Sequence, residues 1–146
     1  MAPFLFAGPS LLDSNSRQLD TSFVRLKPPA KRGDIDLLLN EEDAAGTIIL
    51  ADGRFHSELA VGHSELRRAI RAGWEIWGVS SMGAIRACEM RSTGMKGFGV
   101  IYGFFMDDPD FADDEVALLH IPDPPYHAVS EPLVHTRMFL RYPGYV

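Results

Sequence analysis

Short apolar runs recur along the first eighty residues of the chain, and each ends at turn-forming residues. The runs are Phe4–Ala7, Phe23–Leu26, Thr47–Ala51 and Trp74–Val79. They are rich in β-branched and aromatic residues, which is typical of strands buried inside a sheet. The pattern therefore predicts four buried strands in this part of the chain.

Helical patterns lie between these runs. Residues 35–40 follow Asp34, which is a good helix cap, and a second amphipathic segment ends at Gly73. Residues 84–90 are good helix formers. Alternating strands and helices predict a single α/β domain over residues 1–146, with a mostly parallel open sheet and helices on both faces, in a Rossmann-like three-layer arrangement.

The pattern changes after Met90. Residues 91–103 contain four glycines, which predicts a tightly turned segment, and an acidic stretch follows at residues 107–115. Val116–His120 has the pattern of another strand, and Val129–Tyr142 that of a further helix. We therefore expect this part of the chain to be organised differently from the repeating units before it.

Composition excludes several classes of protein. Hydrophobic residues make up 46% and charged residues 23% of the chain, as in ordinary globular domains. The net charge of −6 lacks the basic footprint of a nucleic-acid-binding protein. One cysteine, Cys88, excludes an intrachain disulfide and a cysteine-based zinc site. The first apolar run is too short for a signal peptide or a membrane span, so the expected compartment is the cytoplasm, without a membrane partner.

The corner between the Trp74–Val79 strand and the following helix is the strongest candidate site. Ser80 and Ser81 lie on it, and a serine at a sharp strand-to-helix turn is the arrangement of the nucleophile elbow. Centring the elbow on Ser81 places Gly83 two residues later, whereas centring it on Ser80 places Gly78 two residues earlier. Because Gly83 relieves crowding where the helix starts, Ser81 is favoured. The structural alternative is that either serine only caps the helix.

A serine nucleophile needs a proton acceptor within hydrogen-bond reach. His63 is the first candidate, because its segment begins near the edge of the sheet that carries the elbow. His120 is the second. Asp52, directly after a buried strand, or Glu65, two residues after His63, would orient the imidazole as the third member of a triad.

Attack on an acyl carbon builds negative charge that needs preorganised donors. The amides of Met82 and Gly83 are the first candidates, because they lie at a helix N-terminus. Gly8 or Ser10, on the turn after the first strand, would supply a further donor. Arg86 lies one helical turn on and would bind a substrate carboxylate, or alternatively form a structural salt bridge.

Two charged segments have alternative interpretations. The loop at residues 27–32, which ends at Arg32, is either a solvated loop or a docking site for an anionic partner. The acidic stretch at residues 107–115 lacks the spacing of an EF-hand.

The sequence Gly97-Phe98-Gly99 alone is too weak to indicate a dinucleotide site. No metal and no cofactor is therefore predicted.

Several segments together resemble the TfuA-like proteins. They are Phe6–Ser10, Pro28-Pro29 with Arg32-Gly33-Asp34, Asp52–Phe55, Val61–Leu66, Ser80–Glu89, Gly94–Gly99, Asp113–Ala117 and Ser130–Val134. Each motif is weak alone, but eight motifs in one order are specific.

This resemblance implies a role beside a YcaO-type enzyme in replacing a peptide backbone carbonyl oxygen by sulfur. The implied partners are the YcaO-type enzyme, a ubiquitin-like sulfur-carrier protein and, as a further candidate, the precursor peptide. An enzyme of this kind would hydrolyse the thiocarboxylated carrier through its serine elbow and deliver sulfide. The first alternative is a non-catalytic adaptor that docks the carrier or the peptide onto the YcaO-type enzyme. The second is a nucleotide-binding α/β module, although no proper phosphate loop supports it.

Overall fold

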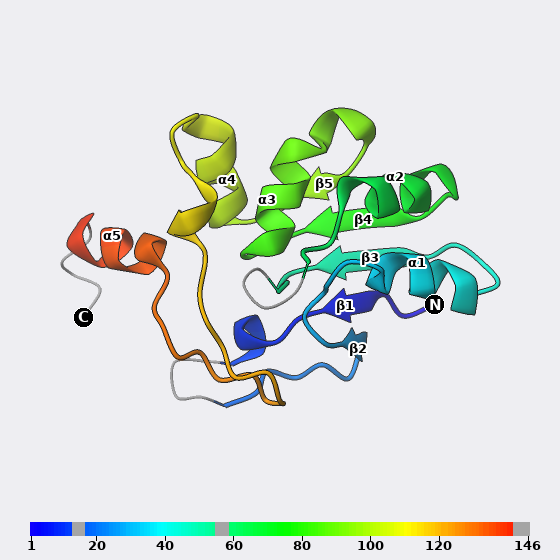
Figure 1. The fold of residues 1–146 in the computed structure, drawn as a ribbon, viewed down its shortest axis with the longest axis horizontal. Coiled ribbons are helices and arrows are strands. Elements are labelled where there is room, and N and C mark those ends of the chain that lie inside the picture. The colour runs from blue at the N-terminus through cyan, green and yellow to red at the C-terminus, as the bar shows by residue number, and fades with distance from the viewer. Residues whose placement is uncertain (13–16, 55–58, 142–146) are drawn as a thin grey trace.

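The computed structural model describes residues 1–12, 17–54 and 59–141, and is built around a five-stranded, all-parallel sheet in the order β2-β1-β3-β4-β5 (Figure 1). The strands are β1 (Phe4–Phe6), β2 (Arg25–Lys27), β3 (Thr47–Leu50), β4 (Glu75–Gly78) and β5 (Lys96–Gly97). The helices are α1 (Asp34–Glu41), α2 (His63–Arg71), α3 (Met82–Glu89), α4 (Val100–Asp107) and α5 (Leu133–Arg141), with 3-10 turns η1 (Pro9–Leu11), η2 (Arg91–Thr93) and η3 (Asp113–Glu115). The α/β class expected from the sequence is confirmed.

The register of the sheet brings three strand ends side by side. Phe6 of β1 is paired with Leu50 of β3, and Leu50 is paired with Gly78 of β4. The chain leaves β1 toward one side of the sheet and builds β3, β4 and β5 toward the other. In such doubly wound sheets, ligands bind beyond the carboxyl ends of the strands at this change of direction. The residues that follow Phe6, Leu50 and Gly78 therefore meet at the favoured position for a site.

Helices cover one face of the sheet, and the 3-10 turn η1 packs against part of the other. Alternate strand residues such as Phe4, Ile48 and Ile76 share one buried cluster with side chains of α1, α2 and α3. On the other face, Leu11 of η1 packs with Ala7 and Ala51 in a second cluster. The sheet is thus the middle of three layers, and α4 and α5 lie beyond its carboxyl edge (Figure 1).

The part of the chain after Met90 differs from its predicted pattern. Val116–His120 is not a strand: its sheet-like pairing with other described residues is limited to an isolated bridge between His120 and Ala128, and Leu119 is 50% exposed. This apolar run follows η3 and does not pair with a strand of the sheet. The glycine-rich segment contains β5 and α4, and the expected C-terminal helix is present as α5.

Among the described residues, no helix combines the length and the apolar character that crossing a lipid bilayer would require.

Candidate functional site

Asp52 is the centre of a hydrogen-bond network at the carboxyl edge of the sheet. It follows β3 and is only 3% exposed. Its Oδ2 accepts hydrogen bonds from the backbone amides of Gly8 (2.8 Å) and Ser10 (2.9 Å). Its Oδ1 accepts from the hydroxyls of Ser10 (2.7 Å) and Ser81 (3.1 Å). Both carboxylate oxygens are therefore occupied, and Asp52 joins the turn after β1 to the turn after β4.

The hydroxyls form a chain with a defined direction. Ser10 must donate to Asp52, because a carboxylate oxygen only accepts. The Ser10 hydroxyl has a single hydrogen, so in its 2.5 Å contact with Ser80 the Ser80 hydroxyl is the donor. Hydrogen bonds consequently run from Ser80 through Ser10 to Asp52. The hydroxyl hydrogen of Ser80 therefore points toward Ser10, and a lone pair of the Ser80 oxygen is left free on its other side.

The corner that carries the serines has the geometry of an elbow. Ser80 has φ = 63°, in the left-handed region that costs a residue other than glycine about 1–3 kcal/mol. Ser81 is the N-cap residue of α3, yet its side chain makes no capping hydrogen bond. The Ser80 hydroxyl bonds Ser10 instead. Helix capping, the structural alternative for this pair, therefore does not explain the positions of their hydroxyls.

Small residues allow the helix to approach the sheet this closely. A Cβ on Gly83 would overlap the backbone carbonyl of Leu50, and one on Gly78 would overlap the carbonyl of Gly83. The amide of Gly83 donates to Ala51 O at 3.2 Å. The start of α3 thus rests directly on the ends of β3 and β4, and holds the serines over Asp52.

This packing changes the assignment of the anion-binding donors. The amide of Gly83 is used by Ala51, and those of Gly8 and Ser10 by Asp52. These three amides hold the corner together and are not directed at a substrate. The amide of Met82 makes no hydrogen bond to another described residue. Of the amides that the sequence predicted as anion-binding donors, only that of Met82 is not used by another described residue.

The structure does not bring His63 to the serines. Its Nε2 lies 2.5 Å from Oε2 of Glu89, at the far end of α3. Glu89 is eight positions beyond Ser81, which corresponds to about 12 Å along a helix. The same Glu89 oxygen accepts from Arg86 Nη1 at 2.9 Å, and Arg86 Nε donates to Val61 O. Arg86 therefore forms the structural salt bridge that was the alternative to substrate binding.

A further carboxyl group belongs to the surroundings of this ion pair. Partial burial, followed by the negative charge of Glu89, raises the pKa of Asp113 above its usual value, while Arg86 opposes the shift. His63, Arg86 and Glu89 are thus part of a charged cluster between α2, α3 and η3, separate from the serines.

Glu65 has a structural role in the fold. It is 2% exposed and accepts hydrogen bonds from the amides of Gly33, Ile35 and Gly62. It therefore ties together the starts of α1 and α2 and does not orient an imidazole at the elbow. Arg32 donates through Nε to Ala60 O at 3.3 Å.

The other cations of the 27–32 loop also have partners within the chain. Lys31 Nζ lies 3.2 Å from Oδ1 of Asp34, and Lys27 Nζ lies 5.7 Å from the centre of the Phe4 ring. These contacts give the loop a local structural role, and its docking role stays a prediction.

A histidine that the sequence analysis passed over lines the cavity beside the serines. This cavity of about 340 Å³ is bounded by Ser10, Ser80 and Ser81 on one side and by His135 of α5 on another. Nδ1 of His135 lies 2.5 Å from Oε1 of Glu131, which lines the same cavity. His120 bonds Ile121 O through Nδ1 instead.

A local signal for this pair was present in the sequence. Glu131 and His135 are four residues apart at the start of a predicted helix, a spacing that places both side chains on one face. The sequence did not reveal that α5 lies beyond the carboxyl edge of the sheet, which is what brings the imidazole to the cavity.

Comparison with known proteins supports one family. No curated protein matches the chain. The family model described as TfuA-like protein matches residues 52–143, more than half of the chain. The match includes Asp52, both elbow serines and the Glu131–His135 pair, whereas Gly8 and Ser10 precede it. The chain therefore belongs to the TfuA-like protein family.

Proposed function

We propose that this chain hydrolyses a thiocarboxylated sulfur-carrier protein through Ser80 and delivers the sulfide to a YcaO-type enzyme. Membership of the TfuA-like family links the chain to peptide backbone thioamidation, with which YcaO-type enzymes are associated. The observation that carries the proposal is the directed hydrogen-bond chain from Ser80 through Ser10 to the buried carboxylate of Asp52. It starts at a residue held in a left-handed conformation, beside an open cavity.

In the first step, the Ser80 oxygen attacks the thiocarboxylate carbon at the end of the carrier. A carbon–oxygen bond forms as the hydroxyl proton of Ser80 passes to Ser10 and Ser10 passes its own proton to the carboxylate of Asp52. The carbon–sulfur bond then breaks, the proton returns from Asp52 through Ser10 to the sulfur, and hydrosulfide leaves. The product is an ester between the carrier and Ser80.

Negative charge on the tetrahedral intermediate requires donors at the corner. The amides of Ser81 and Met82 follow the nucleophile at the N-terminus of α3 and make no hydrogen bond to another described residue. Donors of this kind are worth about 10²–10³ in rate when they face the developing oxyanion. We therefore assign these two amides to the oxyanion, in place of the Met82 and Gly83 pair expected from the sequence.

In the second step, water hydrolyses the ester and releases the carrier carboxylate and a proton. This water needs a proton acceptor that faces the cavity, whereas the hydroxyls of Ser10 and Ser81 lie against Oδ1 of Asp52. His135 lines the same cavity and is held by Glu131 through Nδ1. We assign His135 the role of general base toward this water, in place of His63.

Sulfide release by the purified protein tests this function. We expect the chain alone to release sulfide from a thiocarboxylated ubiquitin-like carrier, and Ser80→Ala to lower the single-turnover rate at least about 10³-fold, because the nucleophile is removed. Ser81→Ala should keep the rate within about ten-fold, since it deletes one hydrogen bond to Asp52. Ser92, exposed in η2, supplies the control Ser92→Ala.

The outcomes separate the proposal from its alternatives. Release that survives Ser80→Ala and fails with Ser81→Ala would return the nucleophile to Ser81. No release by the wild-type protein, combined with retained binding of the carrier, would contradict hydrolysis and support the adaptor. Calorimetric binding of ATP without sulfide release would support the nucleotide-binding module.

A further inference from the structure

Helix α4 is apolar, yet the chain buries it only in part: Ile101, Phe104 and Phe105 pack against a buried cluster of Ile85, Val116 and Val134. Seven uncharged residues precede Asp107 in this helix, among them Ile101, Phe104 and Phe105, and none of its residues is fully buried. Val100 is 61% exposed and Met106 is 42% exposed. A helix with so much apolar surface is normally covered by other parts of a protein. Its exposure points to a surface that is covered by a partner.

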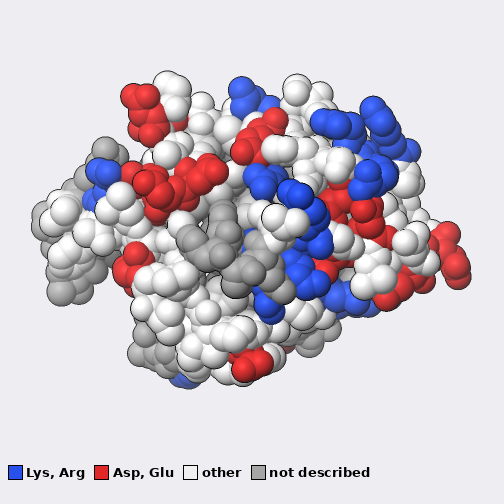
Figure 2. Space-filling model, in the orientation of Figure 1, with Lys and Arg blue, Asp and Glu red and all other residues white. Residues whose placement is uncertain are grey.

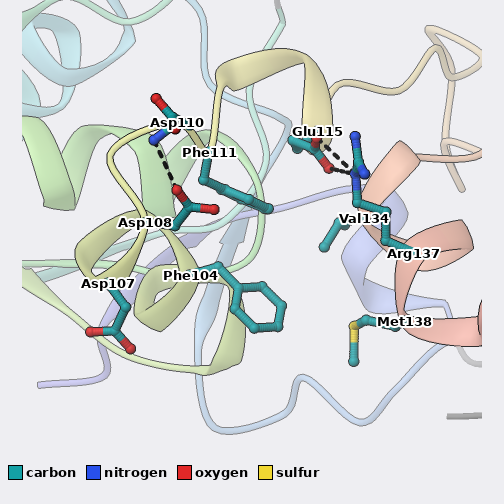
Figure 3. A pocket seen from close by; sticks show the side chains of 9 residues that line it. All are labelled: Phe104, Asp107, Asp108, Asp110, Phe111, Glu115, Val134, Arg137 and Met138. Atoms are coloured by element: carbon teal, nitrogen blue, oxygen red, sulfur yellow. Dashed lines mark hydrogen bonds and ion pairs between the residues drawn. The ribbon is translucent and has the colours of Figure 1, made fainter. Parts of the chain in front are cut away.

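A groove lies between α4 and α5 and is lined on one side by Phe104 and Asp107 of α4. It has a volume of about 430 Å³, and its apolar floor is formed by Phe104, Phe111, Val134 and Met138. In Figure 3 the two phenylalanine rings face Val134 and Met138 across the groove. Phe111 packs against Phe104 with ring centroids 5.6 Å apart, which fixes that wall. The groove has room for a few side chains of a bound segment.

The rim of the groove is acidic. Asp107, Asp108 and Asp110 lie on the α4 side, whereas Glu115 is neutralised by Arg137, whose Nε lies 2.8 Å from Oε2. The three aspartates are exposed, and none forms an ion pair within the described part of the chain. Figure 2 shows acidic side chains gathered over the region of α4 and η3.

The carboxylates are spread along the rim and do not converge on one point. Among the residues that the structure describes, no three histidine, cysteine or acidic side chains are arranged to hold a metal ion. A groove with separate carboxylates around an apolar floor is complementary to a ligand that carries separate positive charges around an apolar side chain.

We propose that this groove binds a basic polypeptide segment of a protein partner, with an apolar side chain in the floor and lysine or arginine side chains at Asp107, Asp108 and Asp110. The charge disfavours other occupants. A second copy of the chain would place one acidic rim against another, and anionic lipid surfaces and nucleic acids would be repelled. The inference rests on the groove alone and is independent of hydrolysis at Ser80.

Fluorescence anisotropy with labelled pentapeptides tests the proposal. The first peptide alternates three lysines with phenylalanine and leucine, the second replaces the lysines by glutamates, and the third replaces the two apolar residues by serines. We expect the wild-type chain to bind the first peptide at least ten-fold more tightly than either of the others, with an affinity that falls as salt is raised.

Variants then locate the binding surface. The triple variant Asp107→Asn, Asp108→Asn, Asp110→Asn should weaken binding of the first peptide at least ten-fold. A control with the same change of charge elsewhere, Glu41→Gln, Asp43→Asn, Asp123→Asn, alters exposed residues outside the groove and should keep the wild-type affinity. Equal affinity for all three peptides would overturn the proposal. An equal loss of affinity for the first peptide in both triple variants would also overturn it. Concentration-dependent dimerisation that the groove variant abolishes would overturn it in favour of a second copy.

Discussion

Replacing Gly83 by alanine is expected to destabilise the whole domain and to abolish sulfide release. An added Cβ would overlap the backbone carbonyl of Leu50, and no rotation of a side chain can relieve a clash between backbone atoms. Helix α3 would have to move away from β3 and lose the hydrogen bond from Gly83 N to Ala51 O. We expect a cost of about 3 kcal/mol or more in the free energy of unfolding, and a Tm about 10 °C lower. Gly83→Val should lower the stability further, because its side chain is larger.

Gly103 provides the matched control for this substitution. It lies inside α4, and a Cβ added there would meet nothing within 4 Å. Gly103→Ala should therefore be neutral or raise stability by up to about 1 kcal/mol, because alanine favours the helix. Thermal unfolding of the two variants measures the difference. A Gly83→Ala protein with the Tm and rate of the wild type would show that the close packing of α3 on β3 is not required.

Asp52→Asn is expected to leave the domain folded and to lower the rate of sulfide release about 10²–10⁴-fold. The asparagine oxygen can still accept from the amides of Gly8 and Ser10. Its NH2 group must then face the hydroxyls of Ser10 and Ser81, which currently donate to the carboxylate. Ser10 would have to accept instead, and its proton would turn toward Ser80. The direction of the hydrogen-bond chain is thereby reversed while the packing is kept.

Asp52→Ala distinguishes this effect from a loss of structure. It leaves the amides of Gly8 and Ser10 without an acceptor and should cost about 2–5 kcal/mol in stability as well as activity. Asp36→Asn is the surface control, because it alters an exposed ion pair with Arg68, and exposed ion pairs contribute little to stability. Single-turnover rates and urea unfolding measure both quantities. An Asp52→Asn variant with the rate of the wild type would remove Asp52 from the mechanism.

Four of the five strands were predictable from local signals, whereas β5 (Lys96–Gly97) lies in the glycine-rich segment that was expected to be tightly turned. Thr47–Ala51 is a β-branched run, and the structure has β3 at Thr47–Leu50. Val116–His120 shows the limit of such patterns. An apolar run becomes a strand only where it pairs with another strand, and this segment instead follows η3 and joins no strand of the sheet. Local sequence does not contain that information.

Part of the site could also be predicted from the sequence. Ser10, Asp52, Ser80 and Ser81 each follow a predicted strand, and parallel strands end at the same edge, so their meeting follows from topology. The network itself depends on the register that aligns Phe6, Leu50 and Gly78, which the sequence does not determine.

The choice of histidine required tertiary structure. His63 follows the β3 strand in sequence but lies at the start of α2, where its imidazole reaches Glu89 at the far end of α3. His135 is 54 residues beyond Ser81 in sequence, and only the placement of α5 brings it to the cavity. Long-range packing of this kind leaves no mark in local periodicity.

Trapping of the covalent intermediate tests the central claim, that Ser80 is the nucleophile, most directly. The protein is mixed with thiocarboxylated carrier, quenched in acid within one turnover, and analysed by intact and peptide mass spectrometry. His135→Asn, which should slow hydrolysis of the ester, is expected to accumulate a carrier adduct that maps to Ser80 and is absent from Ser80→Ala. Sulfide release without an adduct in both the wild-type protein and His135→Asn would contradict the account. An adduct that maps to a residue other than Ser80 would also contradict it.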